Sequence, residues 1–487
     1  MIIKLQTKSD ANSPLIVALF EGEAPESSLL GKNTLDLVAA LTKSKVFSGK
    51  KDQILNSVFD TKTKPRVILL YGLGKEADWN EKEARNFGAK IIRAAKGVKE
   101  KTVDLRIPSL AQDDLQAFAE GILLGDYNPA IYKTGEEQKK REKEALQTIS
   151  LLAKDWDHHQ RERISRAQAL AETINDTRDL VNCGPNHLSI SAFVDEIRGA
   201  AKEHSITITD LDKKKLEKLG MGGLLAVNRG SEESAHMVIL EHKGAKEEPL
   251  VICGKGIVFD TGGISLKPSN SMQDMQLDMA GAAVVLGVFK LLKKLDIKRH
   301  VIGIMPITDN AVGPHSYRPS DIISTYSGKT VEIANTDAEG RMILCDALSY
   351  AVDKYKPKYL IDLATLTGAC MVALGYRTAG LFGTDQGLIE KIKTAAQRTD
   401  EAVCHLPITE ADEKSIKGKL ADLTNLADVP YGGACRAAAF LKQFVGETKW
   451  AHLDIAGTAF TKEPKDYEVN MATGYGIRLL VDFLENL

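Results

Sequence analysis

The chain has little cysteine, and no two cysteines stand in a C-x-x-C spacing. Six are scattered over 487 residues, and none comes before position 183. A disulfide framework needs many cysteines in a short chain, so this distribution fits a reduced, intracellular protein instead. Each cysteine is expected to be a small buried hydrophobe.

Neither sign of charge dominates, and no apolar run is long. The formal net charge is −2 and the pI is about 6.6. No bulk basic field therefore points to nucleic acid or an anionic membrane. Charged and polar residues interrupt the N-terminus, which lacks the apolar core of a signal peptide, and the run near 279–289 is short for a bilayer. We expect a cytoplasmic protein without a membrane or nucleic-acid partner.

Two common site motifs are missing. No H-E-x-x-H occurs, which excludes the familiar zinc-protease helix. Gly328-Lys329-Thr330 resembles the end of a P-loop, but Ile323 stands where the loop needs glycine, so nucleotide binding is excluded. The sequence also shows no internal repeat and no low-complexity tract.

The length requires more than one core, and two or more domains are expected. Residues 1–155 read as an N-terminal α/β domain, 156–182 as a linker helix and 183–487 as a second, larger domain. In the first domain, strand-like runs alternate with helical patterns, at 15–20, 66–72, 80–96 and 110–124. The charge run 134–145 is typical of a solvated face.

In the larger domain, apolar runs of strand length recur with helical segments between them. They lie at 207–211, 236–242, 249–253, 300–306, 358–364 and 450–455. This rhythm predicts βαβ units and a mainly parallel central sheet flanked by helices. In such sheets, ligands bind beyond the carboxyl ends of the strands.

The most informative stretch is NTDAEGR, residues 335–341. In an extended backbone Asp337, Glu339 and Arg341 would point the same way, because side chains two apart share a face. A metal ion removes the repulsion between two carboxylates, and the arginine could hold an anion. The alternative is a surface turn with an ion pair, which is common and usually inert.

A second cluster follows the apolar run 249–253. The glycine-rich segment GKGIVFDTGGISLKP, residues 254–268, contains Lys255, Asp260 and Lys267. Asp274 and Asp278 come next, at the start of an expected helix, where a spacing of four places them on one face. Lys255 is either directed to water or held uncharged by a metal ion. Three polar residues outside this group, Asp362, His452 and His315, are expected to be hydrogen-bonded buried groups.

These segments together resemble the leucine aminopeptidase family, the dinuclear-metal cytosol aminopeptidases. NTDAEGR is the signature of that family, and the segments 254–268 and 275–283 match its other metal-site segments in order. The likeness extends over roughly 165–487, through RDLVNCGPNHLS, GMGGLLAVNRGS, ATLTGA, YGGACRAAAFLKQFV, WAHLDIAG and ATGYGIRLL.

The resemblance implies a two-metal site. Asp260 and Glu339 would bridge the ions, Lys255 and Asp278 would complete the tighter position, and Asp337 the more exchangeable one. Lys267 and Arg341 would be the catalytic residues that bind no metal, with Arg341 holding a bicarbonate as general base. Carboxylate ligands by themselves favour manganese or magnesium, whereas the family implies zinc, with manganese able to exchange. We expect two divalent ions, zinc first, manganese next and magnesium third.

The resemblance also implies the activity and the assembly. The protein would hydrolyse the N-terminal residue, leucine or another mostly apolar one, from peptides and aminoacyl amides through a water bridged by both metals. Family members form homohexamers. The S1 pocket would be lined by Met275, Thr365, Gly368, Ala456 and Ala459. Ala459 replaces the methionine of some members, which would widen that pocket.

Two other functions compete with this interpretation. One is a DNA-binding or regulatory role of the N-terminal domain, which some bacterial members of the family have and which the charge balance here does not favour. The other is a two-metal phosphatase. Such sites usually combine histidine with aspartate, and none of the ten histidines falls in the acidic cluster.

Overall fold

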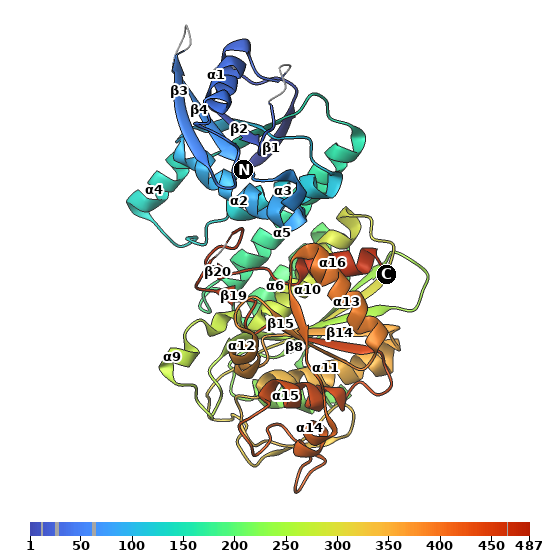
Figure 1. The fold of residues 1–487 in the computed structure, drawn as a ribbon. Coiled ribbons are helices and arrows are strands. Elements are labelled where there is room, and N and C mark those ends of the chain that lie inside the picture. Colours follow the sequence, from blue (N-terminus) through green and yellow to red (C-terminus); the bar gives the residue numbers. More distant parts are fainter. Residues whose placement is uncertain (11–12, 25–28, 61–64, 465) are drawn as a thin grey trace. The chain divides into compact units, whose positions relative to one another are not determined.

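The computed structural model describes the chain except for residues 11–12, 25–28, 61–64 and 465, and except for the side chains of 59–60, 65 and 140–144. Contacts divide the chain into two compact units (Figure 1). The first consists of Met1–Glu172 with Pro464–Val469, and the second of Thr173–Glu463 with Asn470–Leu487. The division falls inside α5 (His158–Val181), in the stretch where a linker helix was expected.

The first unit has a six-stranded mixed sheet in the order β1-β6-β5-β2-β4-β3. Only β3 and β4 pair antiparallel. The strands are β1 (Ile2–Gln6), β2 (Leu15–Leu19), β3 (Ile54–Asp60), β4 (Pro65–Gly72), β5 (Thr102–Arg106) and β6 (Thr148–Leu152). The helices are α1 (Lys32–Lys43), α2 (Glu81–Gly97), α3 (Gln112–Gly125) and α4 (Gly135–Glu144). The central strand β2 is apolar and wholly buried, as parallel strands covered on both faces must be. The predicted α/β domain is confirmed.

The second unit has a nine-stranded, mainly parallel sheet in the order β16-β15-β18-β14-β9-β11-β8-β7, with β10 also on β11. The strands are β7 (Thr207–Leu211), β8 (His236–Lys243), β9 (Leu250–Gly254), β10 (Gly256–Asp260), β11 (His300–Asn310), β14 (Tyr359–Ala364), β15 (Ala379–Gly383), β16 (Val403–His405) and β18 (Trp450–Asp454). Each predicted strand of this domain is present, so the predicted fold class is confirmed. Two small sheets accompany it. One consists of β12 (Ile322–Ser324), β13 (Thr330–Glu332) and β17 (Leu423–Thr424), and the other of β19 (Phe460–Thr461) and β20 (Met471–Ala472).

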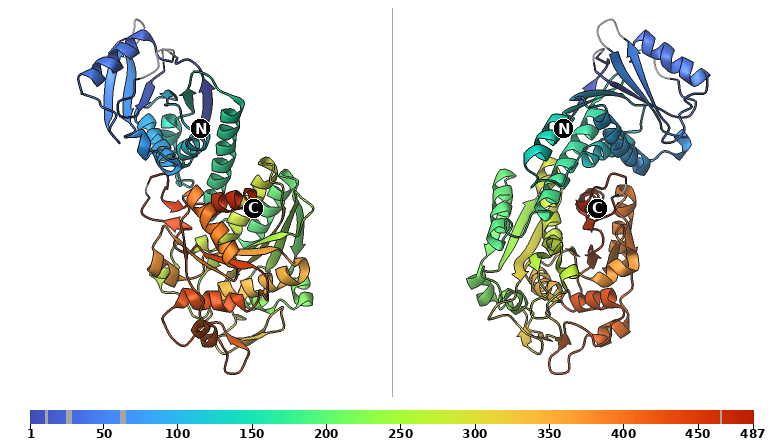
Figure 2. Two further views of the ribbon diagram at one scale, coloured as in Figure 1. Left: turned by 45° about the vertical axis from the view of Figure 1, so that its right-hand side comes forward. Right: turned by 90° about the vertical axis from the view of Figure 1, so that its left-hand side faces the viewer.

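Helices cover both faces of this sheet (Figures 1 and 2). On one face α10 (Ala280–Lys294) packs on β9, β11 and β14 with α6 (Ile190–Glu203) and α16 (Ile477–Glu485). On the other, α11 (Glu339–Tyr355) packs on β9 and β11 with α8 (Gly222–Asn228) and α15 (Gly433–Lys442). The remaining helices of this unit are α7 (Lys213–Leu219), α9 (Ser269–Met272), η2 (Met275–Met279), α12 (Gly368–Leu374), α13 (Gln386–Thr399) and α14 (Glu410–Ser415).

One helical stretch of the described chain, Met275–Lys294, is long and apolar enough to cross a membrane. Of the apolar segment in this stretch, 83% is buried inside the fold, as is typical of a core helix. From the sequence, the apolar run near 279–289 is too short to span a bilayer, because that run ends at Phe289. The helix continues through Leu291 and Leu292, which are buried as well.

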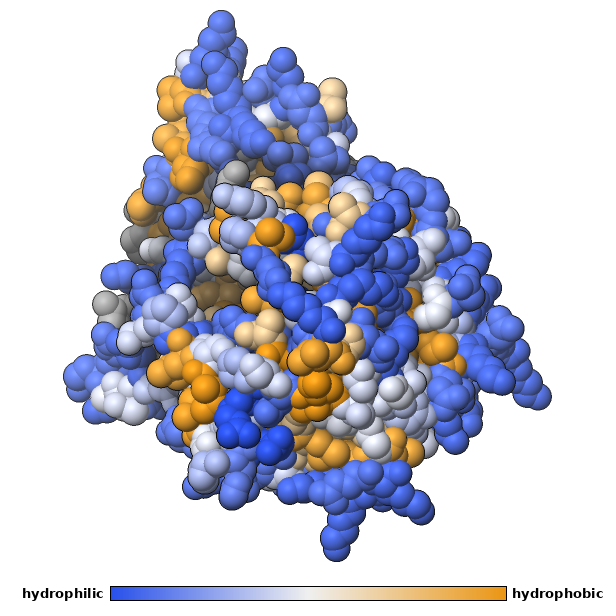
Figure 3. Space-filling view, turned by 90° about the horizontal axis from the view of Figure 1, so that it is seen from below, coloured by the Kyte–Doolittle hydropathy of each residue, from blue (hydrophilic) through white to orange (hydrophobic). Residues whose placement is uncertain are grey.

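The surface is mainly hydrophilic in the view of Figure 3, with hydrophobic residues gathered in several patches. The most exposed large hydrophobic side chains are Val372, Leu420 and Tyr431, at 87%, 84% and 80%. Exposed apolar groups in patches of this kind often mark contacts between proteins. Of the cysteines, Cys253, Cys345 and Cys370 are buried as expected, and the other three are half-buried.

Candidate metal centre

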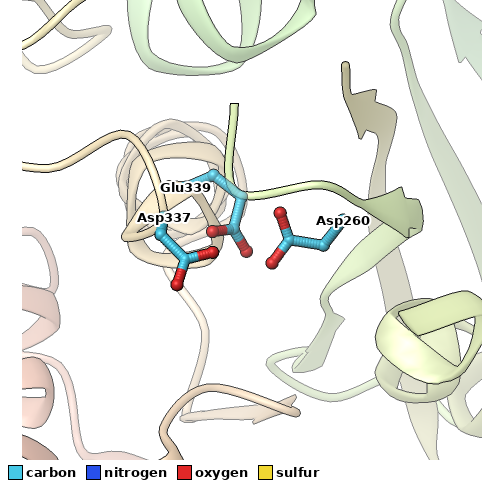
Figure 4. A group of neighbouring side chains, drawn as sticks. All are labelled: Asp260, Asp337 and Glu339. Carbon is cyan, nitrogen blue, oxygen red and sulfur yellow. The ribbon is translucent and has the colours of Figure 1, made fainter. Parts of the chain in front are cut away.

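Three carboxylates from two segments converge at one point (Figure 4). Asp260 is the last residue of β10, Glu339 is the first of α11, and Asp337 lies in the turn before that helix. One oxygen from each of the three lies within 4.8 Å of the others. Asp260 and Glu339 are each 2% exposed. Two buried acids and a third, Asp337, whose side chain is 33% exposed, repel one another at this distance unless cations lie between them.

Two lysines lie between the acids. Lys255 Nζ is 2.7 Å from carboxylate oxygens of both Asp278 and Glu339, and it also donates to the carbonyl of Thr365. Lys267 Nζ is 2.8 Å from Asp260 and 2.6 Å from Asp337. The five predicted metal ligands and Lys267 therefore form one continuous cluster.

The donor set fits divalent cations. Four carboxyl groups, from Asp260, Asp278, Asp337 and Glu339, face only two ammonium groups, from Lys255 and Lys267. The cluster thus has an excess of anionic oxygen ligands, which hard or borderline divalent ions take. Bound cations would also relieve the crowding of the acids.

The electrostatics of the cluster follow from its burial. Burial, assisted by the charge of Asp260, raises the pKa of Glu339 to about 8, and burial also raises the pKa of Asp278 to about 6. Burial alone would lower the pKa of Lys255, but the charges of Asp278 and Glu339 outweigh it and raise that pKa. The crowded acids thus keep Lys255 and Lys267 protonated. The raised pKa values of Glu339 and Asp278 mean that these two acids bind protons at a higher pH than ordinary carboxyl groups do.

The backbone of NTDAEGR differs from the extended form expected from its sequence. Asp337 lies in a turn, and Glu339 and Arg341 lie in the first turn of α11, where side chains two apart point in different directions. The extended prediction is therefore wrong. Arg341 is 5% exposed and donates from NH1 to the carbonyl of Asn425 at 2.6 Å. Burial lowers its pKa to about 10.

Asp274 and Asp278 do not share a helix face. Asp274 has a left-handed backbone, with φ of 72°, directly before the 3-10 helix η2. Asp278 points into the cluster and is 3% exposed, whereas Asp274 forms an ion pair with Lys462 at 2.7 Å. The prediction of one face is wrong because the helix begins after Asp274 and is wound more tightly than an α-helix.

Glycines allow these segments to approach one another. Gly262 has φ of +84°, and a Cβ there would lie 2.6 Å from the carbonyl oxygen of Ser265 and 2.9 Å from Asp337 Oδ1. A Cβ on Gly340 would lie 2.7 Å from Cε of Lys255 and 2.8 Å from its Nζ. The glycine of NTDAEGR therefore makes room for the lysine that follows β9.

Lys255 owes its position to a break between two strands. β9 and β10 both pair parallel with β11, at Val301–Ile304 and at Ile307–Asn310, and Lys255 stands between them. Its backbone N–H donates to Leu363 of β14. The side chain thus leaves the sheet at the carboxyl end of β9, where ligands of such sheets bind.

Sequence reasoning missed the residues that hold the ligands in place. Asn310 Nδ2 donates to Asp260 Oδ1 at 2.8 Å and to the Thr336 carbonyl at 3.0 Å. Asn425 Oδ1 accepts the backbone N–H groups of Ala334 and Asn335. Asparagines near strand ends carry no distinguishing sequence signal, and Asn310 ends β11 four residues beyond the strand predicted at 300–306.

The cluster lies at one end of a cavity of about 510 Å³. Four of the predicted pocket residues, Met275, Thr365, Gly368 and Ala456, line it, and so do Met371, Tyr376 and Phe460, which the sequence analysis did not name. Ala459 is 4% exposed and does not belong to this lining. Thr365 has a second contact, since its hydroxyl donates to Asp278 Oδ1 at 2.6 Å. Arg341 is also absent from the lining.

The polar residues expected in the core behave differently from one another. Asp362 is fully buried and accepts hydrogen bonds from Trp450 Nε1 and His452 Nδ1, both at 2.6 Å. The prediction of hydrogen-bonded buried groups is confirmed for Asp362 and His452. It is wrong for His315, which is exposed in the segment after β11.

Comparisons with known proteins agree with this geometry. The catalytic-domain model of the cytosol aminopeptidase family matches residues 175–481, and the N-terminal-domain model of that family matches 16–136. A probable cytosol aminopeptidase of Geobacter sp. (strain M21) is 36% identical over 97% of each chain. One of Geobacter sulfurreducens is 39% identical over 97% of this chain and 96% of its own. The bottromycin maturation enzyme BotP in complex with Mn superposes with a TM-score of 0.84 at 29% identity, covering 98% of this chain and 99% of that one.

Proposed function

Because this chain belongs to the cytosol aminopeptidase family, and is therefore a metal-dependent exopeptidase, we propose that it removes leucine and other mostly apolar N-terminal residues from peptides and aminoacyl amides. The observation that carries this proposal is the convergence of Asp260, Asp337 and Glu339 within 4.8 Å at the end of a cavity of about 510 Å³.

We propose two divalent ions at this centre, zinc or manganese first and magnesium third, held by the five predicted ligands Lys255, Asp260, Asp278, Asp337 and Glu339. The complex of BotP with Mn supports manganese. When bound, such ions would increase the acidity of a water molecule and the electrophilicity of a carbonyl group. Lys255 would then bind as the free amine, since a cation displaces its proton.

The residues of the chain itself perform the rest of the reaction. Lys267 is 15% exposed by its side chain and lies beside Asp260 and Asp337 on the cavity wall. Its ammonium group is placed to stabilise the oxyanion that forms when an amide carbonyl is attacked. A free N-terminus would be required because an α-amine, unlike an acylated nitrogen, could serve as a ligand to one of the ions.

Arg341 is proposed to hold a bicarbonate ion that acts as general base. Within the described part of the chain, its buried Nε has no hydrogen-bond partner, so one donor remains for an anion.

The apolar wall of the cavity supports a preference for apolar residues. Met275, Thr365, Gly368 and Ala456 are proposed to contact the N-terminal side chain of the substrate, together with Met371 and Phe460. Ala459 stays a prediction, since it is 4% exposed and does not line the cavity.

We also propose that the protein is a cytoplasmic homohexamer, as the family resemblance implies. The exposed side chains of Val372 and Tyr431, on the segments around α12 and α15, support a contact between subunits, because large apolar groups at 87% and 80% exposure are costly in water. Light scattering of the purified protein would test the assembly.

The decisive experiment is removal of the metal. Chelation should abolish hydrolysis of leucine amide, and manganese or zinc should restore it, while N-acetyl-leucine amide should not be cleaved. Asp260→Ala and Glu339→Ala should each lose both bound metal and activity. Glu410→Ala, which removes an acid from an exposed ion pair on α14, is the matched control. Full activity of the metal-free protein would refute the proposal.

A further inference from the structure

The cavity contains one charged pair outside the metal cluster. Among its lining residues, Lys255 and Lys267 bind the acids of the cluster, which leaves Asp274 and Lys462. Lys462 Nζ lies 2.7 Å from Asp274 Oδ2. The side chain of Asp274 is 19% exposed and that of Lys462 is 72% exposed. This pair therefore lies at the mouth of the cavity, on the side open to solvent.

The backbone conformation of Asp274 favours this contact. Aspartate before a helix normally accepts an N–H group of the first turn. Asp274 precedes η2 but makes no such bond, and its backbone is left-handed, with φ of 72°. Aspartate and asparagine tolerate this backbone better than other residues with a Cβ. The carboxylate is thus turned away from its own helix and toward Lys462.

Both members of the pair adjoin the apolar wall. Asp274 is followed by Met275, and Lys462 comes two residues after Phe460, and both of these neighbours line the cavity. Tyr376 lies on the same wall, and its phenol is close enough to Lys462 to affect its pKa, which Asp274 raises above the ordinary value. A substrate side chain that extends beyond Met275 therefore meets this pair next.

We propose that the Asp274–Lys462 pair sets the charge selectivity of the pocket, so that the protein accepts N-terminal residues with uncharged side chains and discriminates against acidic and basic ones. This inference rests on the proposed function. A closed pair presents no net charge, so neither an ammonium nor a carboxylate on the substrate gains enough attraction to offset its loss of water. Either member alone would attract side chains of the opposite charge.

Two conservative variants separate the members of the pair. Asp274→Asn keeps a residue that tolerates the left-handed backbone and leaves Lys462 unpaired. It should raise kcat/KM for glutamyl amide relative to leucine amide by about twofold to fivefold. Lys462→Met keeps the apolar stem and leaves Asp274 unpaired. It should raise kcat/KM for lysyl amide relative to leucine amide by a similar factor.

Two further variants serve as controls. The double variant Asp274→Asn with Lys462→Met removes both charges and should bring both ratios back to those of the wild type. Lys414→Met removes a lysine of the same 72% exposure, paired with Glu410 at 2.6 Å outside the cavity, and should leave both ratios unchanged. Leucine amide is the internal reference, so a general loss of activity or of folded protein does not move the ratios.

The outcomes separate this inference from the function on which it rests. A wild-type protein that cleaves leucine amide but prefers glutamyl or lysyl amide would overturn the inference alone. So would single variants whose ratios stay at the wild-type values. A wild-type protein that cleaves no aminoacyl amide with either metal would overturn the proposed function and the inference with it.

Discussion

Thr365 has two proposed roles, and its hydroxyl group allows them to be tested separately. The family resemblance predicts that Thr365 contacts the substrate in the pocket. The structure shows instead a 2.6 Å hydrogen bond from its hydroxyl group to Oδ1 of Asp278, one of the proposed metal ligands. Thr365→Val keeps the size and shape of the side chain and removes only this donor. We expect the variant to bind metal more weakly, because Asp278 loses the group that orients it.

The size of the effect follows from the kind of bond. A hydrogen bond to a charged group contributes about 1.5–3 kcal/mol, and loss of a residue that orients a metal ligand costs about 10-fold to 100-fold in metal affinity. Asp278 keeps its contact with Lys255 Nζ at 2.7 Å, which places the expected effect toward the lower end. The manganese concentration for half-maximal activity should therefore rise about tenfold.

The assay is hydrolysis of leucine amide by chelator-treated protein titrated with manganese. Most of the lost rate should return at saturating metal. Thr399→Val, which removes a hydroxyl that donates to the carbonyl of Ala395 on α13, is the matched control and should titrate like the wild type. A raised KM for leucine amide with an unchanged manganese titration would refute the reasoning and leave Thr365 as a wall residue.

Three further predictions concern the cluster and the core. Lys267→Met should keep its metal, since it removes positive charge from among the acids, and lose about 100-fold to 1000-fold in kcat; loss of metal would make Lys267 a ligand. Gly340→Ala should fold but bind less metal, because the added Cβ would lie 2.8 Å from Nζ of Lys255 and would displace that group. A normal metal content of this variant would contradict the prediction. Burial lowers the pKa of His452, but the charge and hydrogen bond of Asp362 outweigh burial and raise that pKa above 6.5. The pairing of His452 with Asp362 therefore stabilises the fold fully below pH 6.5. This stabilisation decreases as the pH rises through the folded-state pKa of His452. The difference in melting temperature between wild type and His452→Gln should shrink from about pH 6 to about pH 9, and a constant difference would exclude this pairing as its source.

The sheet of the larger unit could be predicted because its strands are short apolar runs bounded by turns. The run at 249–253 and the run at 358–364 became β9 and β14, and both are buried throughout. The convergence of the acids and lysines could be predicted for a related reason. Acids and lysines that directly follow such runs have few structural uses in a parallel sheet, whose carboxyl edge is where ligands bind.

The conformation of NTDAEGR could not be read from spacing alone. Charged residues at alternate positions fit an extended backbone as well as a turn that enters a helix. The stretch after Arg341 is mostly apolar and free of glycine and proline up to Tyr355, which is a helix pattern. Asn335 to Asp337 are residue types that often precede helices. Reading both signals together would have placed the helix start at Glu339.

The residues that hold the ligands lie beyond local reasoning. Asn425 binds the backbone at Ala334 and Asn335 from about ninety positions away. Asn310 reaches Asp260 only because β10 and β11 pair in the register that places these two residues opposite each other. Such contacts depend on strand order and register, and neither follows from the composition of the two segments.

The segment from Asp274 to Asp278 serves both ends of the cavity. In an α-helix these two acids would lie on one face and both would add to the negative charge of the metal cluster. The left-handed backbone of Asp274 and the tighter winding of η2 separate them, so that Asp278 contacts Lys255 and Asp274 contacts Lys462. Each acid therefore faces its own lysine, one at the buried end and one at the solvent end. Changes in the winding of η2 should consequently alter metal binding and charge selectivity together, whereas changes of Asp274 or Lys462 alone should alter only selectivity.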